Sequence, residues 1–317
     1  MSKKITRRKF IEKSGVMGVA AAGAVTFSGL SSCSLFKDPA DIAVIQGQNY
    51  FENTMKSVEQ IGGMEKFVPK GSNVGLLINS DFEIFGTYVN PDISIAAVKM
   101  MVDAGAAEIT CLQVVKDEYW QRSKYYEEYK DMLASLKHVE SNTFPAEYNE
   151  EEFVRFENID GAISLEKTEV AKKWLDCDVF VNIPISKHHM TTLLTGALKN
   201  IMGVSTREAN ITFHLGSGER NDPDYIAQCI VDQNMLKKTN LCIVDATEVI
   251  IDNGPSGPGT IEIPAKIVAG TDIVAIDALC STFIGYEPDE ILTTVKGHEM
   301  GLGNMNYNEM NIVELTV

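Results

Sequence analysis

The sequence predicts an α/β fold, with a mostly parallel sheet flanked by helices and built from βαβ units. Two observations lead to this prediction. Short apolar runs that are typical of strands alternate along the chain with amphipathic segments that are typical of helices. One of the runs, Cys177 to Ile183, is an apolar segment of the kind that a sheet buries on both faces.

The composition is that of an ordinary globular protein. Of the 317 residues, 44% are hydrophobic and 23% are charged, which provides a full core for one or two domains. The chain has 44 acidic and 28 basic residues, and its net charge of −16 would repel the phosphates of a nucleic acid. We therefore expect no nucleic-acid partner.

The first 32 residues have the pattern of a signal peptide. Residues 3–13 carry six basic side chains, and a nearly uncharged run rich in Gly, Ala and Val follows. Arg7 and Arg8, with Phe10 behind them, resemble the twin-arginine motif that an export receptor reads. The apolar run could instead be a membrane-spanning helix, but glycines interrupt it and it is shorter than the ~20 apolar residues of a span.

Leu30 to Cys33 resembles a lipobox, in which the cysteine thiol takes a diacylglycerol; the alternative is a chance cysteine behind a cleavage site. Cleavage before Cys33 leaves 317 − 32 = 285 residues with a net charge of −16 − 6 + 1 = −21. We expect a signal peptide over 1–32, a tether over 33–41 and one α/β domain over 42–317. The twin-arginine export machinery would then be a partner, and a lipid anchor would hold the protein on the periplasmic or extracellular side of the cytoplasmic membrane.

Local patterns predict the elements of the domain. The clearest helix opens with Pro91 in its first turn and stops near Gly105. Strand, helix and strand over residues 74–115 predict a right-handed parallel βαβ unit. The expected strands lie at residues 42–45, 74–78, 109–115, 177–183, 241–244, 267–269 and 312–315. The expected helices lie at residues 51–61, 91–105, 167–175, 225–236, 273–283 and 288–299.

Residues 116–152 are dense in Tyr, Glu and Lys, and we expect a surface insertion with one helix. Its aromatic residues recur at roughly helical spacing and are interpreted as packing residues, with a ligand site as the alternative. They are Trp120, Tyr125, Tyr126 and Tyr129.

Five cysteines remain after Cys33, an odd number without a Cys-x-x-Cys pair. This spacing argues against an iron–sulfur cluster or a structural zinc site held by this chain. Cys111, Cys177 and Cys242 lie in or beside apolar runs, so buried free thiols are expected.

The densest group of reactive side chains follows the strand predicted at 177–183. Lys187, His188 and His189 come at its carboxyl end, where open α/β sheets bind ligands and where the following helix offers N–H groups to an anion. A histidine near neutral pKa can serve as acid, base or metal ligand, and a lysine can hold a carboxylate. The alternative is a solvated loop.

A glycine-rich loop follows a later strand. Asn253, Gly254 and Gly257 belong to it, and we expect its backbone to approach a ligand closely, with a bare turn as the alternative. Asp245 ends the strand before this loop and is the preferred carboxylate for a ligand or metal. Asp272 is well placed to cap the next helix.

Residues 181–203 resemble the signature of the domain of unknown function family 362, and further matches extend the resemblance over roughly residues 42–317. The chain differs from many relatives in having Ile78-Asn79-Ser80 in place of Lys-Pro-Asn, and it lacks their ferredoxin-like cysteine module, so no electron-carrying role is transferred. The matching residues are Asn182, Pro184, Lys187, His189, Thr195, Gly196, Lys199, Asn200 and Gly203.

A more distant resemblance concerns the nickel-pincer lactate racemase family, in which a histidine, a lysine ten residues on and a second histidine about fifteen beyond that share one site. His189, Lys199 and His214 have this spacing. The resemblance implies that Lys199 bears a covalent nickel-type cofactor, that His214 binds the metal and that His189 transfers a proton.

The sequence thus predicts an enzyme of the oxidoreductase or isomerase type that acts on a small anionic molecule, with a metal cofactor and, for a redox reaction, an electron-transfer partner. The alternative is a lipoprotein that binds a ligand or handles a cofactor without catalysis. The expected catalytic residues are Lys187, which would hold the anion, His188, His189 and Asp245. The expected cofactor-binding residues are Lys199, Asn200, Asn253, Gly254 and Gly257, with His214 as the metal ligand.

Overall fold

The computed structural model describes residues 39–141 and 146–317. The predicted export motif (Arg7, Arg8) and lipid-attachment site (Cys33) lie outside these residues. None of the described helices is long and apolar enough to cross a bilayer.

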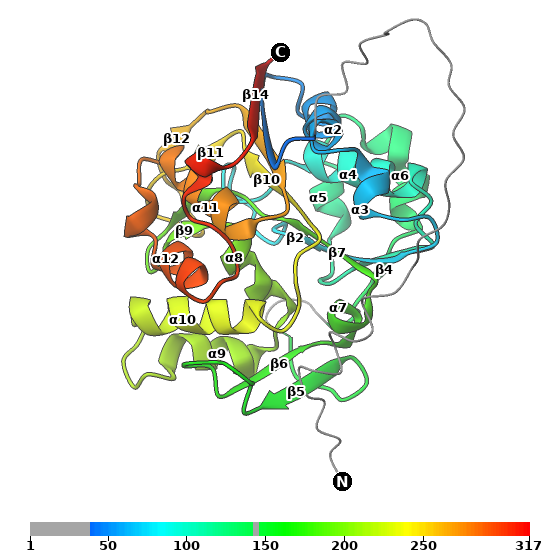
Figure 1. The fold of residues 1–317 in the computed structure, drawn as a ribbon. Helices are drawn as coiled ribbons and strands as arrows, with labels where there is room; N and C mark the ends of the chain where they lie inside the picture. Colours follow the sequence, from blue (N-terminus) through cyan, green and yellow to red (C-terminus); the bar gives the residue numbers. More distant parts are fainter. Residues whose placement is uncertain (1–38, 142–145) are drawn as a thin grey trace, which may run out of the picture. The chain divides into compact units, whose positions relative to one another are not determined.

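One eight-stranded sheet organises the described residues (Figure 1). Seven of its strands run in the same direction, and only β13 is antiparallel to its two neighbours. The prediction of a mostly parallel α/β sheet is therefore confirmed. In their order across the sheet, the strands are β14 (Ile312–Thr316), β1 (Ile42–Gln46), β13 (Lys266–Gly270), β10 (Leu241–Ala246), β7 (Val179–Ile183), β2 (Asn73–Ile78), β3 (Glu108–Cys111) and β4 (Lys137–His138). Three two-stranded hairpins stand outside the sheet: β5 (Phe153–Glu157) with β6 (Lys167–Ala171), β8 (Lys187–His189) with β9 (Leu193–Thr195), and β11 (Val249–Ile250) with β12 (Ile261–Glu262).

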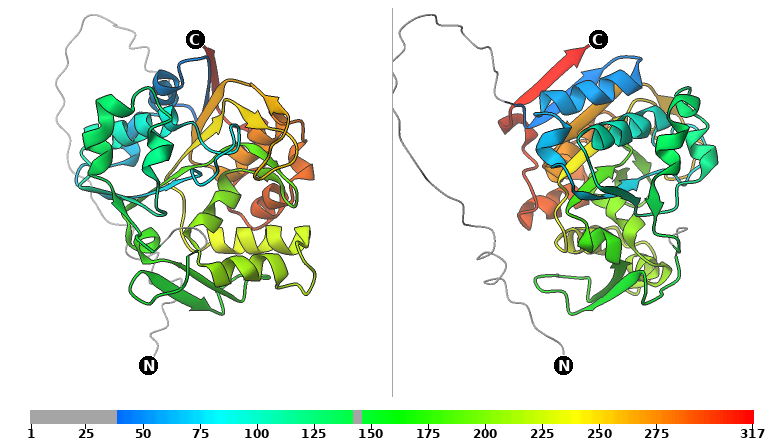
Figure 2. Two further views of the ribbon diagram at one scale, coloured as in Figure 1. Left: turned by 180° about the vertical axis from the view of Figure 1, so that it is seen from behind. Right: turned by 90° about the vertical axis from the view of Figure 1, so that its right-hand side faces the viewer.

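Helices cover both faces of the sheet, as the two further views show (Figure 2). One face is covered by α2 (Tyr50–Gln60), α3 (Met64–Phe67), α4 (Pro91–Asp103), α5 (Asp117–Trp120) and α6 (Tyr126–Ala134). The other is covered by α7 (Lys172–Asp176), α8 (Ala197–Asn200), α9 (Arg207–Leu215), α10 (Pro223–Asn234), α11 (Ile273–Thr282) and α12 (Leu292–Glu299). Short 3₁₀ turns are η1 (Ile201–Val204), η2 (Pro288–Glu290) and η3 (Tyr307–Glu309).

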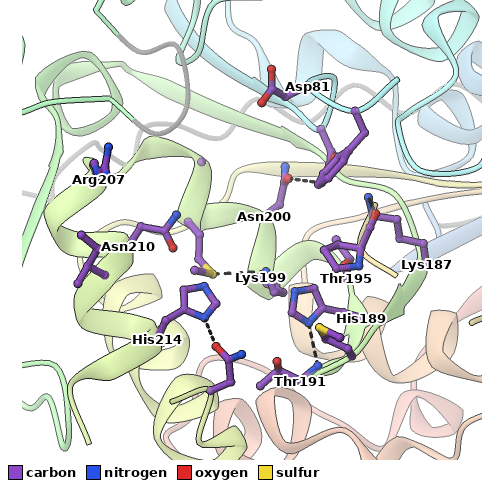
Figure 3. Close-up of a pocket in the computed structure, with 18 of the residues that line it drawn as sticks. Asp81, Lys187, His189, Thr191, Thr195, Lys199, Asn200, Arg207, Asn210 and His214 are labelled. Carbon is purple, nitrogen blue, oxygen red and sulfur yellow. Dashed lines mark hydrogen bonds between the residues drawn. The ribbon is translucent and has the colours of Figure 1, made fainter. Parts of the chain in front are cut away.

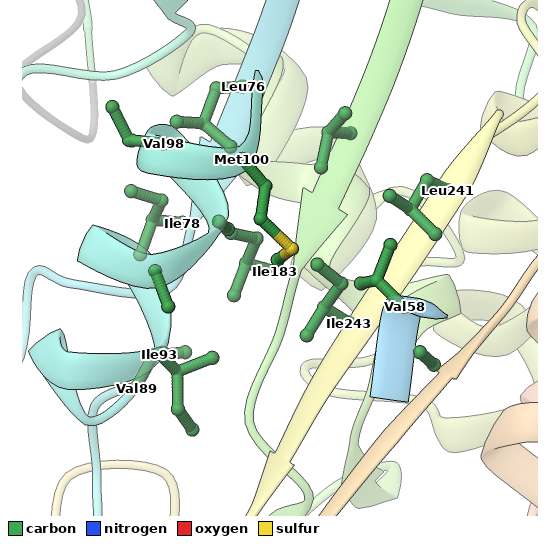
Figure 4. Close-up of a cluster of buried hydrophobic side chains, with 14 of the residues drawn as sticks. Val58, Leu76, Ile78, Val89, Ile93, Val98, Met100, Ile183, Leu241 and Ile243 are labelled. Atoms are coloured by element: carbon green, nitrogen blue, oxygen red, sulfur yellow. The ribbon is translucent and has the colours of Figure 1, made fainter. Parts of the chain in front are cut away.

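Successive side chains on a strand point to opposite faces, so each central strand feeds two hydrophobic cores. In β10, Leu241 and Ile243 pack with the α4 side, whereas Cys242 and Val244 pack with the α8 and α11 side. Figure 4 shows the first core, where α4 lies against β2, β7 and β10. The same alternation decides which face each polar residue near a strand end can reach.

Several helix signals predicted from the sequence hold in the structure. Pro91 occupies the first turn of α4, and Asn90 caps that helix by accepting the N–H of Asp92. Asp272 caps α11 through the N–H groups of Val274 and Ala275, as predicted.

The expected helix over 167–175 is wrong in its first half. Residues 167–171 form β6, which pairs in antiparallel fashion with residues 153–157, and only Lys172–Asp176 is helical. The four residues Thr168 to Ala171 are buried in this pairing, so a distant partner overrides the local pattern. The strand expected over 109–115 is shorter, Glu108–Cys111, and the helix expected over 288–299 is interrupted at Ile291.

The described residues of the insertion expected with one helix form two, α5 and α6. Its aromatic residues pack as predicted: Trp120 is buried, and the rings of Tyr125 and Tyr129 lie 4.4 and 5.6 Å from that of Phe51. Of the remaining cysteines, Cys177 is half-buried and the other four are buried, all as free thiols.

Candidate functional site

A cavity of about 760 Å³ opens at the carboxyl ends of β2 and β7 (Figure 3). From β2 the chain goes through α4 to β3 on one side, whereas β7 and β10 lie on the other side, so the strand order reverses between β2 and β7. This is where open α/β sheets bind ligands. The walls come from residues 79–82, Gln113, residues of β8, β9, α8 and η1, residues of α9 and the loop behind it, and Pro255.

The residues that follow β7 in the sequence form a hairpin, not the predicted helix N-terminus. Lys187 and His189 lie on β8, and α8 begins only at Ala197. The N–H groups of Ala197 and Leu198 donate to the carboxylate of Asp277 at 2.6 and 2.9 Å. The first turn of α8 is therefore taken by a protein carboxylate, and the expectation that it offers N–H groups to an anion is wrong.

Gly196 is required by this same carboxylate. A Cβ at residue 196 would lie 2.3 Å from Oδ1 of Asp277, well inside van der Waals contact. Burial raises the pKa of Asp277 to about 7. The hydrogen bonds from the two N–H groups lower this pKa, but their effect is the smaller one.

A chain of amide hydrogen bonds positions α8. Asn79 Nδ2 donates to Asn200 Oδ1 at 3.3 Å, and Asn200 Nδ2 donates to Asn182 Oδ1 at 2.7 Å. Asn182, in turn, donates to the carbonyl of Ala197 at 2.9 Å. The ends of β2 and β7 are thereby joined to the helix that carries Lys199, whose Nζ lies in the cavity wall 3.5 Å from Sδ of Met202. Burial lowers the pKa of Lys199 to about 8.

His189 is held in a defined tautomer. Its Nδ1 accepts the backbone N–H groups of Thr191 and Thr192 at 3.2 and 3.3 Å, so the neutral ring carries its proton on Nε2. Burial, and then the charge of Lys199, lower the pKa of His189 to about 2. At neutral pH this ring is an uncharged N–H donor.

His214 has the opposite tautomer. Its Nδ1 lies 2.9 Å from Oδ1 of Asn221, so the ring donates from Nδ1 and Nε2 keeps a free lone pair. Burial lowers the pKa of His214, against the hydrogen bond to Asn221, which raises it. The cavity thus has one histidine that can donate a hydrogen bond and one with a free nitrogen that can accept a proton, and the charge of Lys199 acts on both.

Lys187 is fully buried, and protein groups occupy its amino group. Nζ donates to the carbonyls of Thr87 and Pro255, the latter at 2.8 Å, and lies 3.7 Å from the ring centre of Phe82. Burial, followed by the charge of Lys199, lowers the pKa of Lys187 to about 6, although the carbonyls and the ring face favour the protonated amine. Lys187 therefore joins the loop after β2 to the 253–257 loop.

Two arginines that were not predicted from the sequence complete the site. Arg207 lies on α9, and Arg220 lies in the loop that follows α9. The signal was the helical spacing of Arg207, Asn210 and His214, which places all three on one face of α9 (Figure 3). Asp81 is the one carboxylate in the described lining, and it lies 3.8 Å from Lys116.

Two polar atoms in the wall have no hydrogen-bond partner within the part of the chain that the structure describes. They are Oγ1 of Thr195, a residue only 4% exposed, and Oδ1 of Asn210. Buried polar atoms are rarely left unpaired, so these two indicate room for a bound molecule or water.

His188 and the glycine loop lie beside the cavity, and Pro255 is the loop residue in the described wall. The N–H of Gly254 donates to Nδ1 of His188 at 3.0 Å, and a Cβ at residue 254 would lie 1.8 Å from the carbonyl oxygen of His188. The close approach that glycine permits is thus to the β8 backbone. Asn253 and Gly257 are absent from the described cavity lining, to which the loop contributes Pro255.

Asp245 lies apart from the lysines and histidines. It is buried and accepts the N–H of Asn90 at 2.6 Å, together with the N–H and the hydroxyl of Thr247. Strand alternation puts its side chain on the α4 face with Leu241 and Ile243, and it lines a separate, smaller cavity of about 370 Å³. Burial raises the pKa of Asp245.

The described residues contain no group of three or more His, Cys, Asp and Glu side chains that could chelate a metal ion. A metal at this site would need donors from an organic ligand as well as from His214.

A family model for a domain of unknown function (DUF362) matches residues 76–282. A thylakoid-associated protein from Synechocystis sp. is 24% identical over 133 residues, which are 42% of this chain and 40% of that protein. The chain is also similar to the lactate racemase apoprotein from Thermoanaerobacterium thermosaccharolyticum, with a TM-score of 0.45 and 12% identity over 81% of this chain and 56% of that one. A Thermotoga maritima protein gives a TM-score of 0.38 and 14% identity over 67% of this chain and 54% of its own. The chain thus spans 40% of the matched curated protein and 54–56% of the solved chains.

Proposed function

The chain belongs to the DUF362 family, and on that premise we propose that it is an enzyme whose cavity binds a small organic anion and transfers a proton to or from it. One observation carries the proposal. In a chain of net charge −16, this cavity is lined by two lysines, two arginines and two neutral histidines, with one carboxylate that lies near Lys116.

Anion binding follows from the cationic groups of the cavity. Arg207 also lies 3.8 Å from Glu147, but both side chains of this ion pair are exposed, so it contributes little. Lys187 is occupied by two carbonyls, so it positions loops, and Lys199, Arg207 and Arg220 are the groups that would bind the anion. An arginine fork matches a carboxylate or phosphate in two parallel hydrogen bonds, and the half-buried amine of Lys199 adds charge where water is partly excluded.

Proton transfer follows from the two tautomers. Nε2 of His214 has the lone pair of a general base and would take a proton from a carbon beside the anionic group. The electron pair left on that carbon would delocalise onto the carboxylate. There, Nε2–H of His189 and the ammonium of Lys199 would stabilise the added negative charge.

We next compare the side chains of the cavity with what the nickel-type cofactor predicted from the sequence would need. An amine with a pKa of about 8 at Lys199 and a free Nε2 at His214 fit a covalent attachment and a single metal bond. When bound, such a group would supply redox chemistry that these side chains lack. His189, in its tautomer, would donate a hydrogen bond from Nε2–H to the reacting molecule, and its Nδ1, which accepts two backbone N–H groups, would not take a proton.

The experiment that tests the enzyme is hydrogen–deuterium exchange at carbon. Protein purified from its own host would be incubated in D₂O with a panel of 2-hydroxy and 2-amino acids, and exchange of the hydrogen on the carbon beside the carboxylate would be followed by NMR. We expect exchange in at least one compound, reduced by at least about 100-fold in His214→Gln. Tight binding without exchange across the panel would instead assign a non-catalytic ligand-binding protein.

The cofactor is tested separately by elemental analysis and intact mass on the same preparation. Stoichiometric metal together with a mass excess on the peptide that contains Lys199 would assign that amine to a covalent cofactor and leave Arg207 and Arg220 to bind the anion. An unmodified mass without metal would exclude a covalent cofactor at Lys199.

We also propose that the protein is exported and lipid-anchored at Cys33, which the residues of the first 33 positions support. Cys33→Ser should release the protein from membranes into the soluble fraction and remove the lipid mass from its N-terminal peptide. Arg7→Lys/Arg8→Lys should retain the uncleaved precursor in the cytoplasm. A Cys33→Ser protein that stays with membranes would contradict the lipid anchor.

A further inference from the structure

The cavity has an apolar side as well as a cationic one, and α9 provides both. Arg207, Ile211 and Leu215 follow one another at intervals of four residues, and Asn210 and His214 form a second row beside them. All five line the cavity. The opposite face of α9 is anchored in the core, with Phe213 fully buried.

The apolar row is exposed. Ile211 is 47% and Leu215 51% exposed, and Met190, at the tip of the β8–β9 hairpin, is 70% exposed. All three line the same cavity, together with Phe82 and Pro255 from the loops that Lys187 joins. Single exposed apolar residues are ordinary, but several around one cavity mark a binding surface.

The size of the cavity supports the same conclusion. About 760 Å³ is in the range of sites that enclose a drug-sized organic ligand, and a bare inorganic anion would leave most of it to water. The unpartnered hydroxyl of Thr195 and amide oxygen of Asn210 add two polar contacts for such a ligand.

We propose that the molecule bound here is an amphipathic organic anion, with its charged group at Lys199, Arg207 and Arg220 and an apolar arm against Ile211, Leu215 and Met190. The inference rests on the proposed anion site and specifies its ligand class. The charged group fixes the orientation, and the arm covers the exposed row of α9.

The test is isothermal titration calorimetry of the full chain with butyrate, hexanoate and octanoate, each below its micellar concentration. Each buried methylene contributes up to about fourfold in affinity, so we expect octanoate to bind at least about tenfold more tightly than butyrate. The Ile211→Ser/Leu215→Ser variant should reduce that ratio to below about threefold. Ile163→Ser is the matched control, because Ile163 is 69% exposed and outside the described lining, and it should leave the ratio unchanged.

The outcomes separate the two proposals. Equal affinity for butyrate and octanoate would overturn the apolar arm and leave the anion site standing. Octylammonium binding as tightly as octanoate would also overturn the inference, because the cationic wall would then not select the charge. Failure of every alkanoate to bind would count against the proposed anion site itself. The wild-type series decides between these outcomes even if the double variant fails to fold.

Discussion

Asn200 donates a hydrogen bond from Nδ2 to Oδ1 of Asn182 at 2.7 Å, and this pair joins the helix that carries Lys199 to the central strand β7. Both side chains are buried. Since Lys199 directly precedes Asn200, the position of its amine depends on this hydrogen bond within the protein.

Asn182→Ala should therefore destabilise the fold and weaken anion binding together. It leaves Nδ2 of Asn200 and the carbonyl of Ala197 without their partner, which costs about 1–3 kcal/mol in the free energy of unfolding. Urea denaturation measures the loss. Asn306→Ala, at an exposed site, is the control and should change stability by less than about 0.5 kcal/mol. A fully stable Asn182→Ala protein would show that the amide chain is dispensable.

Anion affinity should fall as the pH rises through about 8. Lys199 has a lowered pKa of about 8 in the free protein, and only its protonated form attracts the anion. The dissociation constant of octanoate should then rise up to tenfold per pH unit above this value. Lys199→Arg keeps the charge and should move the decline to higher pH, whereas Lys199→Met should remove it. A pH-independent affinity between pH 7 and 10 would exclude Lys199 as the anion-binding group.

His189 should make the fold sensitive to acid. Its pKa is about 2 in the folded protein and near 6.5 when unfolded, so between these values the unfolded chain binds more protons and stability falls as the pH falls. At pH 4.5 the loss from this group is about 3 kcal/mol relative to pH values above 6.5.

His189→Gln should flatten the stability profile between pH 6.5 and 4.5, as measured by denaturant unfolding at each pH. His298→Gln is the comparison, because His298 lies outside the described cavity lining. An unchanged slope in His189→Gln would mean that the ring takes up its proton in the folded state.

Gly196→Ala should disturb α8 through Asp277. The added Cβ would lie 2.3 Å from Oδ1 of Asp277, so the carboxylate must withdraw from the N–H groups that it accepts. Overpacking and the lost cap together should cost about 1–3 kcal/mol. Gly218→Ala adds a methyl group with no atom within 4 Å, and since residue 218 has φ +89° it reports backbone strain alone. Equal losses in both variants would argue against a special role for the Asp277 contact.

The sequence predicted the central strands of the sheet correctly, because each is mostly apolar and can be recognised without knowing which strands it pairs with. It failed at residues 167–171, where the decisive interaction is pairing with residues 153–157. The order of strands across the sheet, with β13 antiparallel, depends on contacts between distant segments, which no local pattern contains.

For the site, spacing along the chain brought out Lys187, His189, Lys199, Asn200 and His214, which all line the cavity. It could not show that the amine of Lys187 is occupied by carbonyls from two distant loops. Asp245 was a candidate because it ends a strand. Alternate residues of a strand point to the same face, so Asp245 lies on the α4 face of the sheet with Leu241 and Ile243. Counting alternate residues along the predicted strand could therefore have separated Asp245 from the cavity.

Strand β1 lies between β13 and β14, so it pairs only with strands that are synthesised long after it. Residues 42–46 leave the ribosome early, yet they pair with residues 266–270 and 312–316, the last strands to be made. This edge of the sheet can therefore close only after translation has passed its final strand.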